Sequence, residues 1–342
     1  EKLSKLCDSF LMHDRDIFVQ CDDSVVRIWE VQDSKFKIQN SRFKCQLLPI
    51  RRSRGFSPFP VELPFEVPQI LAVGGELKSA FCLTRENFAF MSQHIGDMEN
   101  LETLNSFEKS YNQMKNLFHV EPEIIVGDLH PNYLSTNWAE TKFAKDKKFV
   151  KVQHHHAHIA SVMAENGVKD EKVIGFAFDG TGFGTDGKIW GGEVLIADYE
   201  GFERAAHLKY FPLAGGDVSV KNVYRQALSL LREYKIEWTE DLQCVEFCTE
   251  TERKILLKQL ENNINVVETS SFGRLFDAVS SIASIRQKAT YEAQAAIEFE
   301  SLMDETVSDS YQFKFIEKET ILIDCRKLVT EMVEDVRQNL DF

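Results

Sequence analysis

The sequence lacks several features that would define its class at once. It has no apolar run near the length of about 20 residues that spans a bilayer, and no secretory signal at its start. Its seven cysteines form neither a set of C-x-x-C pairs nor a regular framework, which argues against a zinc ribbon and a disulfide-rich secreted domain. These absences predict a soluble protein of the reducing cytoplasm.

Excess positive charge is missing as well. Lys and Arg total 40 against 54 Asp and Glu, so the net charge is −14. Nucleic acids and anionic membranes are bound by broad basic surfaces, so neither partner is expected. The one local basic group is Arg51, Arg52 and Arg54. With 342 residues, 43% of them hydrophobic, the chain can build two domains with ordinary cores.

Proline and glycine divide the chain. Four of its eight prolines lie between residues 56 and 68, where lost donors and fixed φ angles predict an extended linker and a domain boundary. Residues 1–66 then form one unit, and a second organisation starts at residue 67. Because residues 1–10 have the pattern of a helix already under way, we expect the chain to be part of something longer.

Beyond this linker, a strand–glycine turn–strand pattern occurs twice. The first copy has strands at 69–75 and 80–85, and the second at 173–179 and 188–198, around the glycine-rich turn 180–187. Further strands are expected at 123–128 and 149–153, and helices at 86–118, 154–166, 222–235, 251–262, 273–284, 291–306 and 326–339. Gly167 is a typical residue to end a helix. The recurrence is what a duplicated, two-lobed actin-like α/β fold would show.

His154 and His158 are the first candidates for chemistry. On a helix, residues four apart share a face, so both imidazoles can reach one metal ion. Two ligands are too few for a tight site, so a carboxylate or another histidine must come from elsewhere. The alternative is a histidine-rich helix start whose rings are hydrogen-bonded in a crowded interface, and the spacing does not decide between the two.

The turn after Asp179 is dense in glycine, with Gly180, Thr181, Gly182 and Gly184 in succession. Glycine lets backbone N–H groups approach anionic oxygens closely, which favours a phosphate site. It is neither a Walker A loop nor a dinucleotide fingerprint, since no helix follows. The alternative is an ordinary hairpin closed by its Asp-Gly pair.

Three weaker candidates follow. Gly74 and Gly75 form a similar but sparser turn, and Lys78 could reach a phosphate, although a plain surface lysine is the more common case. Asp128 and His130 follow an apolar strand, and open α/β sheets bind ligands at the carboxyl ends of strands.

Asp277 and Arg274 are polar residues at the start of an otherwise apolar helix. An acid in a first turn can be a simple partner of the helix dipole. A contact from Asp277 to a nucleotide is the sharper alternative.

Together these segments resemble one family, the HypF carbamoyltransferases of [NiFe]-hydrogenase maturation. The resemblance covers almost the whole chain. It rests on the ordered motifs RRSRGFSPFP, LAVGGELKSAFCL, AFMSQHIGDMEN, DLHPNYLST, VQHHHAHIASVMAENG, FAFDGTGFGTDGKIWGGE, FPLAGGD, SSFGRLFDAV and YEAQAAIEFE. In the fold that it implies, 1–66 are the end of a YrdC-like domain and 67–342 are most of a TsaD-like, actin-like domain.

The resemblance also implies a chemistry. Carbamoyl phosphate is hydrolysed to carbamate, which ATP and Mg²⁺ convert to carbamoyl-adenylate. The TsaD-like domain then passes the carbamoyl group to the C-terminal cysteine of HypE, towards the cyanide ligand of the hydrogenase. His154 and His158 match the family's metal ligands, for iron or zinc. Asp179 and glycines 180, 182 and 184 match its second phosphate hairpin, and Asp277 matches an acid that contacts nucleotide.

The chain departs from the family pattern in three ways. The upstream acylphosphatase and C-x-x-C modules are absent, and so are the final SGG and DGG segments, the second of which supplies an aspartate as third metal ligand. An incomplete site with little activity of its own is therefore expected. Ala293 also replaces a usual glycine. A threonylcarbamoyl- or O-carbamoyltransferase and an inactive nucleotide-binding scaffold remain alternatives.

Overall fold

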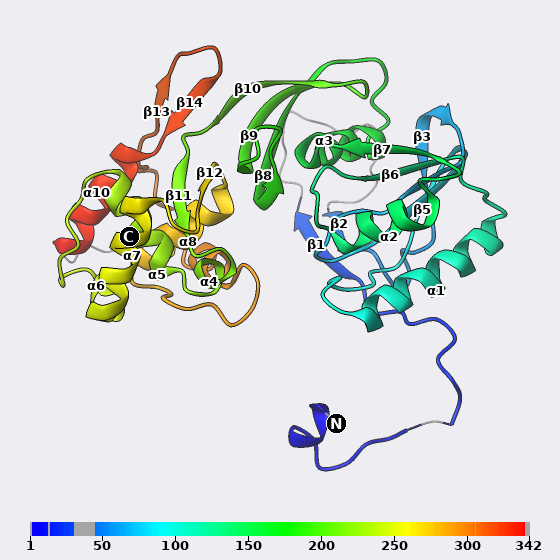
Figure 1. The fold of residues 1–342 in the computed structure, drawn as a ribbon, viewed down its shortest axis with the longest axis horizontal. Coiled ribbons are helices and arrows are strands. Elements are labelled where there is room, and N and C mark those ends of the chain that lie inside the picture. Colours follow the sequence, from blue (N-terminus) through cyan, green and yellow to red (C-terminus); the bar gives the residue numbers. More distant parts are fainter. Residues whose placement is uncertain (1, 13, 31–44, 305, 339–342) are drawn as a thin grey trace. The chain divides into compact units, whose positions relative to one another are not determined.

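The computed structural model describes residues 2–12, 14–30, 45–304 and 306–338 (Figure 1). The chain divides into two compact units. Unit 1 comprises Glu1–Gly127 and Pro131–Val150, and unit 2 comprises Asp128–His130 and Lys151–Phe342. Among the described helices, none combines the length and the apolar composition that crossing a membrane needs.

Unit 1 is built on two sheets. The described chain starts with a short 3-10 helix at Lys2–Lys5. Strand β1 (Val25–Glu30) then pairs antiparallel with β2 (Cys45–Arg51). The larger sheet has the order β3-β5-β4-β6-β7. Its strands are β3 (Pro60–Val67), β4 (Ile70–Ala72), β5 (Cys82–Met91), β6 (Ile124–Asp128) and β7 (Lys148–Val152), and its helices are α1 (Leu101–Phe118) and α2 (Leu134–Phe143).

Aromatic rings fill the core of unit 1. The fully buried ring of Phe81 lies edge-on to those of Phe107 and Tyr111 from α1, at centroid distances of 5.3 and 6.1 Å. Trp138 of α2 packs edge-on against Phe107 at 5.2 Å. Such pairs add about 0.5–1.5 kcal/mol each to the burial of their area, so they fix both helices on the sheet.

Two expectations for this region are corrected. Residues 60–67 do not form a linker but the edge strand β3, where proline is tolerated because one side of the strand makes no ladder hydrogen bonds. The helix predicted from residue 86 starts only at Leu101, because β5 continues to Met91 and pairs with β3 and β4. Cross-strand pairing there overrides the helical pattern of the sequence.

Unit 2 contains a seven-stranded sheet of order β11-β12-β9-β10-β14-β13, with β8 beside β9. Its strands are β8 (Val173–Phe183), β9 (Ile189–Ala197), β10 (Phe202–Leu208), β11 (Phe211–Ala214), β12 (Val266–Thr269), β13 (Lys314–Ile316) and β14 (Ile321–Asp324). Its helices are α3 (His154–Glu165), α4 (Asp217–Lys221), α5 (Tyr224–Glu233), α6 (Gln243–Phe247), α7 (Glu250–Asn262), α8 (Phe272–Ile282), α9 (Gln294–Glu300) and α10 (Arg326–Arg337).

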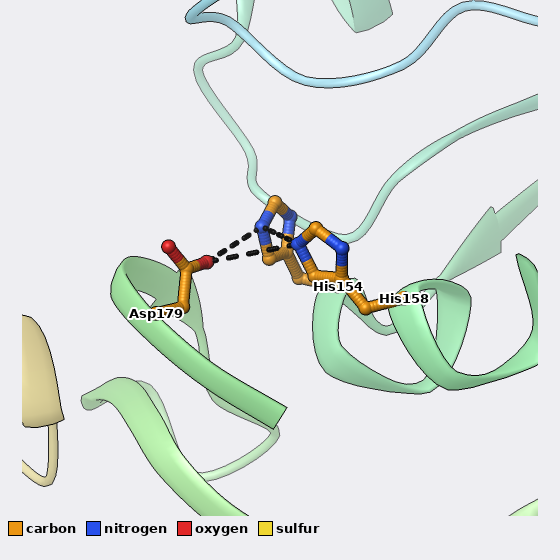
Figure 2. A group of neighbouring side chains, drawn as sticks. All are labelled: His154, His158 and Asp179. Atoms are coloured by element: carbon orange, nitrogen blue, oxygen red, sulfur yellow. Dashed lines mark hydrogen bonds and ion pairs between the residues drawn. The ribbon is translucent and has the colours of Figure 1, made fainter. Parts of the chain in front are cut away.

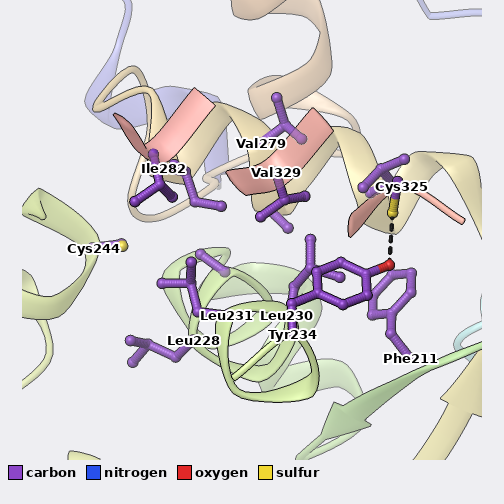
Figure 3. Packing of buried hydrophobic residues seen from close by; sticks show 14 of the residues in the cluster. Phe211, Leu228, Leu230, Leu231, Tyr234, Cys244, Val279, Ile282, Cys325 and Val329 are labelled. Carbon is purple, nitrogen blue, oxygen red and sulfur yellow. Dashed lines mark hydrogen bonds between the residues drawn. The ribbon is translucent and has the colours of Figure 1, made fainter. Parts of the chain in front are cut away.

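Helices α5, α8 and α10 share the main core of unit 2 (Figure 3). Leu230 and Leu231 of α5 are fully buried and meet Ile282 of α8 and Val329 of α10 in one cluster. Burying each such side chain stabilises the fold by about 1.5–3 kcal/mol. The hydroxyl of Tyr234 finds its partner inside this core, 2.9 Å from Sγ of Cys325.

The helices predicted for the second half of the chain are confirmed, with shifted ends. The helix expected at 291–306 starts only at Gln294, because the residue before it, Ala293, has a left-handed backbone with φ 58°. The last predicted helix ends at Arg337, and residue 339 lies outside the described part of the chain.

Candidate metal and phosphate site

The histidine-rich helix α3 starts at His154 and presents two imidazoles to one place. The side chain of Gln153 caps the helix, its Oε1 accepting a hydrogen bond from the backbone N–H of His156 at 2.9 Å. One turn apart on this helix, the Nε2 atoms of His154 and His158 lie 3.2 Å from each other. The predicted shared face is therefore confirmed.

Asp179 of strand β8 supplies a third donor (Figure 2). The strand does not end there, as predicted, but continues to Phe183 by pairing with β9, so the turn starts only at Gly184. Its Oδ2 lies 3.0 Å from Nε2 of His154 and 3.8 Å from Nε2 of His158. All three donor atoms lie within 4.8 Å of one another. Ligands of a tetrahedral ion with bonds of about 2.0–2.2 Å are roughly 3.3 Å apart, so the three residues fit a divalent metal. The sequence had suggested Asp179 for phosphate binding; the structure puts it with the histidines.

A second carboxylate orients His154 from behind. Oδ2 of Asp128 lies 2.7 Å from Nδ1 of His154, and Oδ1 of Asp128 accepts the backbone N–H of His130 at 2.8 Å. Asp128 is buried. A carboxylate on the second ring nitrogen fixes the tautomer and orientation of a ligating histidine. Asp128 is thus placed to direct Nε2 of His154 at the cluster.

The carboxylates also set the charges. Burial acts to lower the pKa of His154, but hydrogen bonds to Asp128 and Asp179 outweigh it and raise the pKa to about 9. Burial acts to raise the pKa of Asp179, and His154 reverses this and lowers the pKa to about 2. Burial and the neighbouring His154 lower the pKa of His158. The cluster therefore concentrates carboxylate charge around two imidazoles.

The other two histidines of the run are structural. His155 is fully buried, and this burial lowers its pKa to about 4, so the ring is neutral. Its Nδ1 contacts the side-chain amide of Gln153 at 3.1 Å. His156 donates from Nε2 to the carbonyl of Asp198 at 2.7 Å. The crowded-interface interpretation of the sequence is thus correct for these two rings.

The glycines of the turn are explained in part by the protein itself. A Cβ on Gly182 would collide with the ring of His155, and one on Gly184 with the ring of Trp190. A Cβ on Gly180 would lie 3.2 Å from Nη2 of Arg274. Thr181 is exposed, and its hydroxyl donates to the carbonyl of Gly180. Of these glycines, Gly180 is the one that faces a cation, and a phosphate role for the turn remains a prediction.

Sequence reasoning missed a polar network beneath the turn. Glu193 of β9 is fully buried, and its carboxylate accepts hydrogen bonds from Nε of Arg204 at 2.6 Å and from the hydroxyl of Ser270 at 2.6 Å. Arg204 also lies over the ring of Trp190, with Cζ 3.8 Å from its centroid. The only signal in the sequence was an acidic residue inside the apolar strand 188–198.

Asp277 and Arg274 lie together in α8. Nη1 of Arg274 is 2.9 Å from Oδ2 of Asp277, and both side chains are at least nine-tenths buried. Gln226 donates to the same oxygen of Asp277 at 3.2 Å. Burial, opposed by Arg274, raises the pKa of Asp277. The helix start is joined to the turn through the hydroxyl of Ser271, 2.6 Å from the carbonyl oxygen of Asp179.

The first glycine loop, with Gly74, Gly75 and Lys78, lies in unit 1. The backbone N–H of Lys78 donates to Asp97 at 2.7 Å. The carboxylate of Glu76, which sequence reasoning also missed, accepts the N–H of Leu134 at the start of α2 at 2.7 Å. This loop is therefore fastened to α2, and its contact with phosphate remains a prediction.

Comparison with known protein families gives two matches. Residues 66–165 match the family described as HypF Kae1-like domain, and 175–341 match the family described as carbamoyltransferase, Kae1-like domain, second subdomain. The first match begins next to the predicted start of the TsaD-like domain at residue 67. The predicted actin-like α/β fold of this part of the chain is confirmed.

Similar curated proteins are carbamoyltransferases of the HypF type. Carbamoyltransferase HypF2 of Cupriavidus necator is 37% identical, over 89% of this chain and 36% of its own length. Carbamoyltransferase HypF of Synechocystis sp. is 36% identical, over 98% of this chain and 44% of its own length. The chain thus spans less than half of these relatives.

Two solved structures resemble the fold. Full-length HypF in a phosphate- and nucleotide-bound form is 40% identical, with a TM-score of 0.87 over 99% of this chain and 50% of that one. HypF of T. kodakarensis is 33% identical, with a TM-score of 0.77 over 92% of this chain and 40% of that one.

Proposed function

The chain belongs to the HypF carbamoyltransferase family, and we propose that it carries the acyl-transfer site of an ATP-dependent carbamoyl transfer. In this proposal the carbamoyl group comes from carbamoyl phosphate, passes through carbamoyl-adenylate, and ends on the C-terminal cysteine of HypE. The product is a precursor of the cyanide ligand of [NiFe]-hydrogenase. The cytoplasm is the proposed location, and neither nucleic acid nor membrane is a proposed partner.

One observation carries the proposal: three metal-ligand side chains converge next to a glycine turn. His154, His158 and Asp179 bring their donor atoms within 4.8 Å of one another. Asp179 is followed directly by Gly180, so a phosphate or acyl group on the turn would lie beside the cluster. The similarity to a HypF structure in a phosphate- and nucleotide-bound form supports phosphate and nucleotide as ligands in this proposal.

The chemistry needs orientation more than a strong base. Carbamoyl-adenylate is a mixed anhydride, so AMP leaves readily once a thiol has attacked the carbamoyl carbon. What the site must supply is alignment of both partners and stabilisation of the charge that develops on the carbamoyl oxygen. A divalent ion, iron or zinc, held by the three residues would polarise that oxygen as a Lewis acid. Mg²⁺ would accompany ATP in the adenylation step.

Asp128 and His130 have supporting roles in this proposal. Asp128 keeps a proton on Nδ1 of His154, which leaves Nε2 free to act as a ligand. Burial lowers the pKa of His130, so its imidazole is neutral at pH 7. The ring packs edge-on against Phe183 at 5.3 Å, beside the glycine turn. His130 is our candidate to accept the proton of the incoming thiol.

Carbamoylation of HypE tests the proposal directly. The full reading frame that contains this chain is mixed with HypE, carbamoyl phosphate, ATP and Mg²⁺, and the HypE C-terminal cysteine is analysed by mass spectrometry. A His154→Ala/His158→Ala variant runs beside the wild type, and His119→Asn in unit 1 is the control. We expect modification by the wild type and the control, and loss of it in the double variant.

The other outcomes separate the parts of the proposal. Modification by the double variant would retain the carbamoyltransferase but remove the histidines from catalysis. If none of the proteins modifies HypE while the wild type still binds ATP, a nucleotide-binding scaffold replaces the enzyme as the better account.

A further inference from the structure

The N-terminus of helix α8 packs against the glycine-rich segment after Asp179. Its first turn carries a positively charged side chain, at the end of the helix where positive charge is unfavourable. Arg274 is the third residue of α8 (Phe272–Ile282), in the first turn, where the helix dipole repels positive charge. The residue is only 7% exposed. A guanidinium remains charged at any physiological pH, so burial at this point costs free energy unless its donors find acceptors.

The acceptors present do not complete the coordination of Arg274. Within the described residues, Nε of Arg274 makes no hydrogen bond, and Nη1 lies in the ion pair with Asp277 without the geometry of a hydrogen bond. Asp277 balances the charge from 2.9 Å, but its Oδ2 is shared with the amide of Gln226. The guanidinium of Arg274 has five N–H donors but is paired with a single carboxylate oxygen. Its capacity to donate hydrogen bonds is therefore not filled.

The open side of the guanidinium faces the turn. A Cβ on Gly180 would lie 3.2 Å from Nη2 of Arg274 and 4.0 Å from Cζ, and among the described residues other than its two chain neighbours it would meet no further atom within 4 Å. The helix start is in close contact with the same stretch, since a Cβ on Gly273 would lie 2.8 Å from the Cα of Gly180. Ser271, the N-cap of α8, bonds to the carbonyl oxygens of Asp179 and Gly180. Glycine at 180 therefore leaves the space over Nη2 unoccupied.

We propose that Arg274 is a phosphate ligand: it binds a phosphoryl oxygen of the nucleotide seated on the glycine-rich segment 180–187, which comprises the end of β8 and the turn after it. This inference rests on the proposed function, and it adds a residue that recognises the negative charge of the ligand. An oxyanion there would meet the guanidinium and the positive end of α8 together, which is the arrangement that anion sites at helix starts use. A phosphate group would thus compensate a cation that the fold holds in an unfavourable place.

Binding measured with and without phosphate groups tests the proposal. Isothermal titration with ATP, AMP, adenosine and inorganic pyrophosphate is run on the wild type, Arg274→Gln and Arg274→Lys. Gly180→Ala is a second probe, since its methyl group covers Nη2 without removing the charge. Arg232→Gln, in an exposed ion pair with Glu261, and Gly201→Ala, with open space around it, are the matched controls.

We expect Arg274→Gln and Gly180→Ala to weaken ATP and AMP about tenfold or more, as loss of a charge-assisted hydrogen bond does. Adenosine should bind as tightly as before, Arg274→Lys should lose less than Arg274→Gln, and the controls should match the wild type. Because the variants could be misfolded, unchanged adenosine affinity is required before a loss of ATP is counted.

Failure of this inference differs from failure of the proposed function. If the wild type binds ATP and Arg274→Gln binds it equally well, Arg274 is a structural clamp for Asp277 and the inference is wrong. If the wild type binds no nucleotide but binds pyrophosphate in an Arg274-dependent way, the anion site stands and the nucleotide function falls. Binding of neither ligand to the wild type overturns both.

Discussion

Oδ2 of Asp128 lies 2.7 Å from Nδ1 of His154, although the two residues are 26 positions apart in the sequence. Asp128 ends β6, and His154 starts α3 directly after β7. This pairing fixes the tautomer and the direction of the His154 imidazole. It links the polar segment after β6 to the candidate metal centre, which neither motif indicates alone.

The first prediction concerns this pair. Replacing Asp128 with Asn keeps the shape but removes the carboxylate charge on Nδ1, and changes to such supporting partners typically weaken metal binding by about 10–100-fold. We expect a loss of zinc affinity in that range, measured by competition with a chromogenic chelator. Asp146→Asn, at an exposed position of unit 1, should bind like the wild type. Equal affinity in Asp128→Asn would show that the pair does not orient the ligand.

Local periodicity was enough to predict some of this site. His154 and His158 share a helix face because they are four residues apart, and α3 forms where the pattern placed it. The strand–turn–strand pattern was also predicted, because glycine density and an Asp-Gly pair are local signals, but β8 continues to Phe183 and the turn starts only at Gly184 instead of at residue 180. Such features depend on neighbours in the sequence, so the sequence contains them.

What the sequence could not give depends on packing between distant segments. Asp179 becomes a third donor because β8 runs beside α3, and Arg204 neutralises Glu193 because β9 and β10 pair. The glycines at 182 and 184 are required by His155 and Trp190, so their density is no proof of a ligand. The loop that contains Gly74 and Gly75 shows the same limit. The hydrogen bond from the start of α2 to Glu76 joins residues 58 positions apart, so no local pattern predicts it.

Glu193 supports the second prediction. It is fully buried and accepts hydrogen bonds from Arg204, Ser270 and the N–H groups of Gly191 and Gly192. Glu193→Gln removes the nearer counter-charge of the Arg204 guanidinium, which keeps only the carboxylate of Asp186 at 3.8 Å, and breaking a buried pair on one side costs about 3–5 kcal/mol. Urea unfolding should show a loss of that order.

Two further variants control this measurement. Glu193→Gln/Arg204→Met removes both charges and should be less destabilised than the single change, because no ion is left unpaired. Glu200→Gln alters an exposed residue and should unfold like the wild type. A double variant that is destabilised more than Glu193→Gln alone would mean that the unpaired guanidinium is not the cause of the loss.

The third prediction is a pH dependence at Asp186, in the turn. Burial acts to raise its pKa, but hydrogen bonds from Tyr210, the backbone of Lys188 and Trp190 outweigh it and lower the pKa. A carboxyl group whose pKa is lower in the folded state stabilises the fold above its unfolded pKa of about 4. That contribution is lost as the pH falls through the folded pKa. The melting temperature of Asp186→Asn should therefore lie below that of the wild type at pH 7, with a smaller difference at pH 3.

Circular dichroism melts at pH 7, 5 and 3 measure this dependence. Asp309→Asn, at an exposed position, should follow the wild type at each pH. If the difference between Asp186→Asn and the wild type does not change from pH 7 to pH 3, the ionised carboxylate does not stabilise the turn.

The last prediction comes from Ala293, where the resembling family usually has glycine. Ala293 adopts φ 58° and ψ 15°, a left-handed conformation that costs an L-residue about 1–2 kcal/mol. Glycine adopts it freely but has more conformational freedom to lose on folding, worth about 0.4–1 kcal/mol. The balance favours Ala293→Gly by roughly 0.5–1 kcal/mol, so this variant should raise the urea midpoint without changing its slope. Ala205→Gly, at the register shift of β10 where the backbone is not left-handed, should do the opposite, because glycine relieves no strain there and adds only its entropic cost. A destabilised Ala293→Gly would show that the left-handed start of α9 is not strained, and that the family's glycine has another cause.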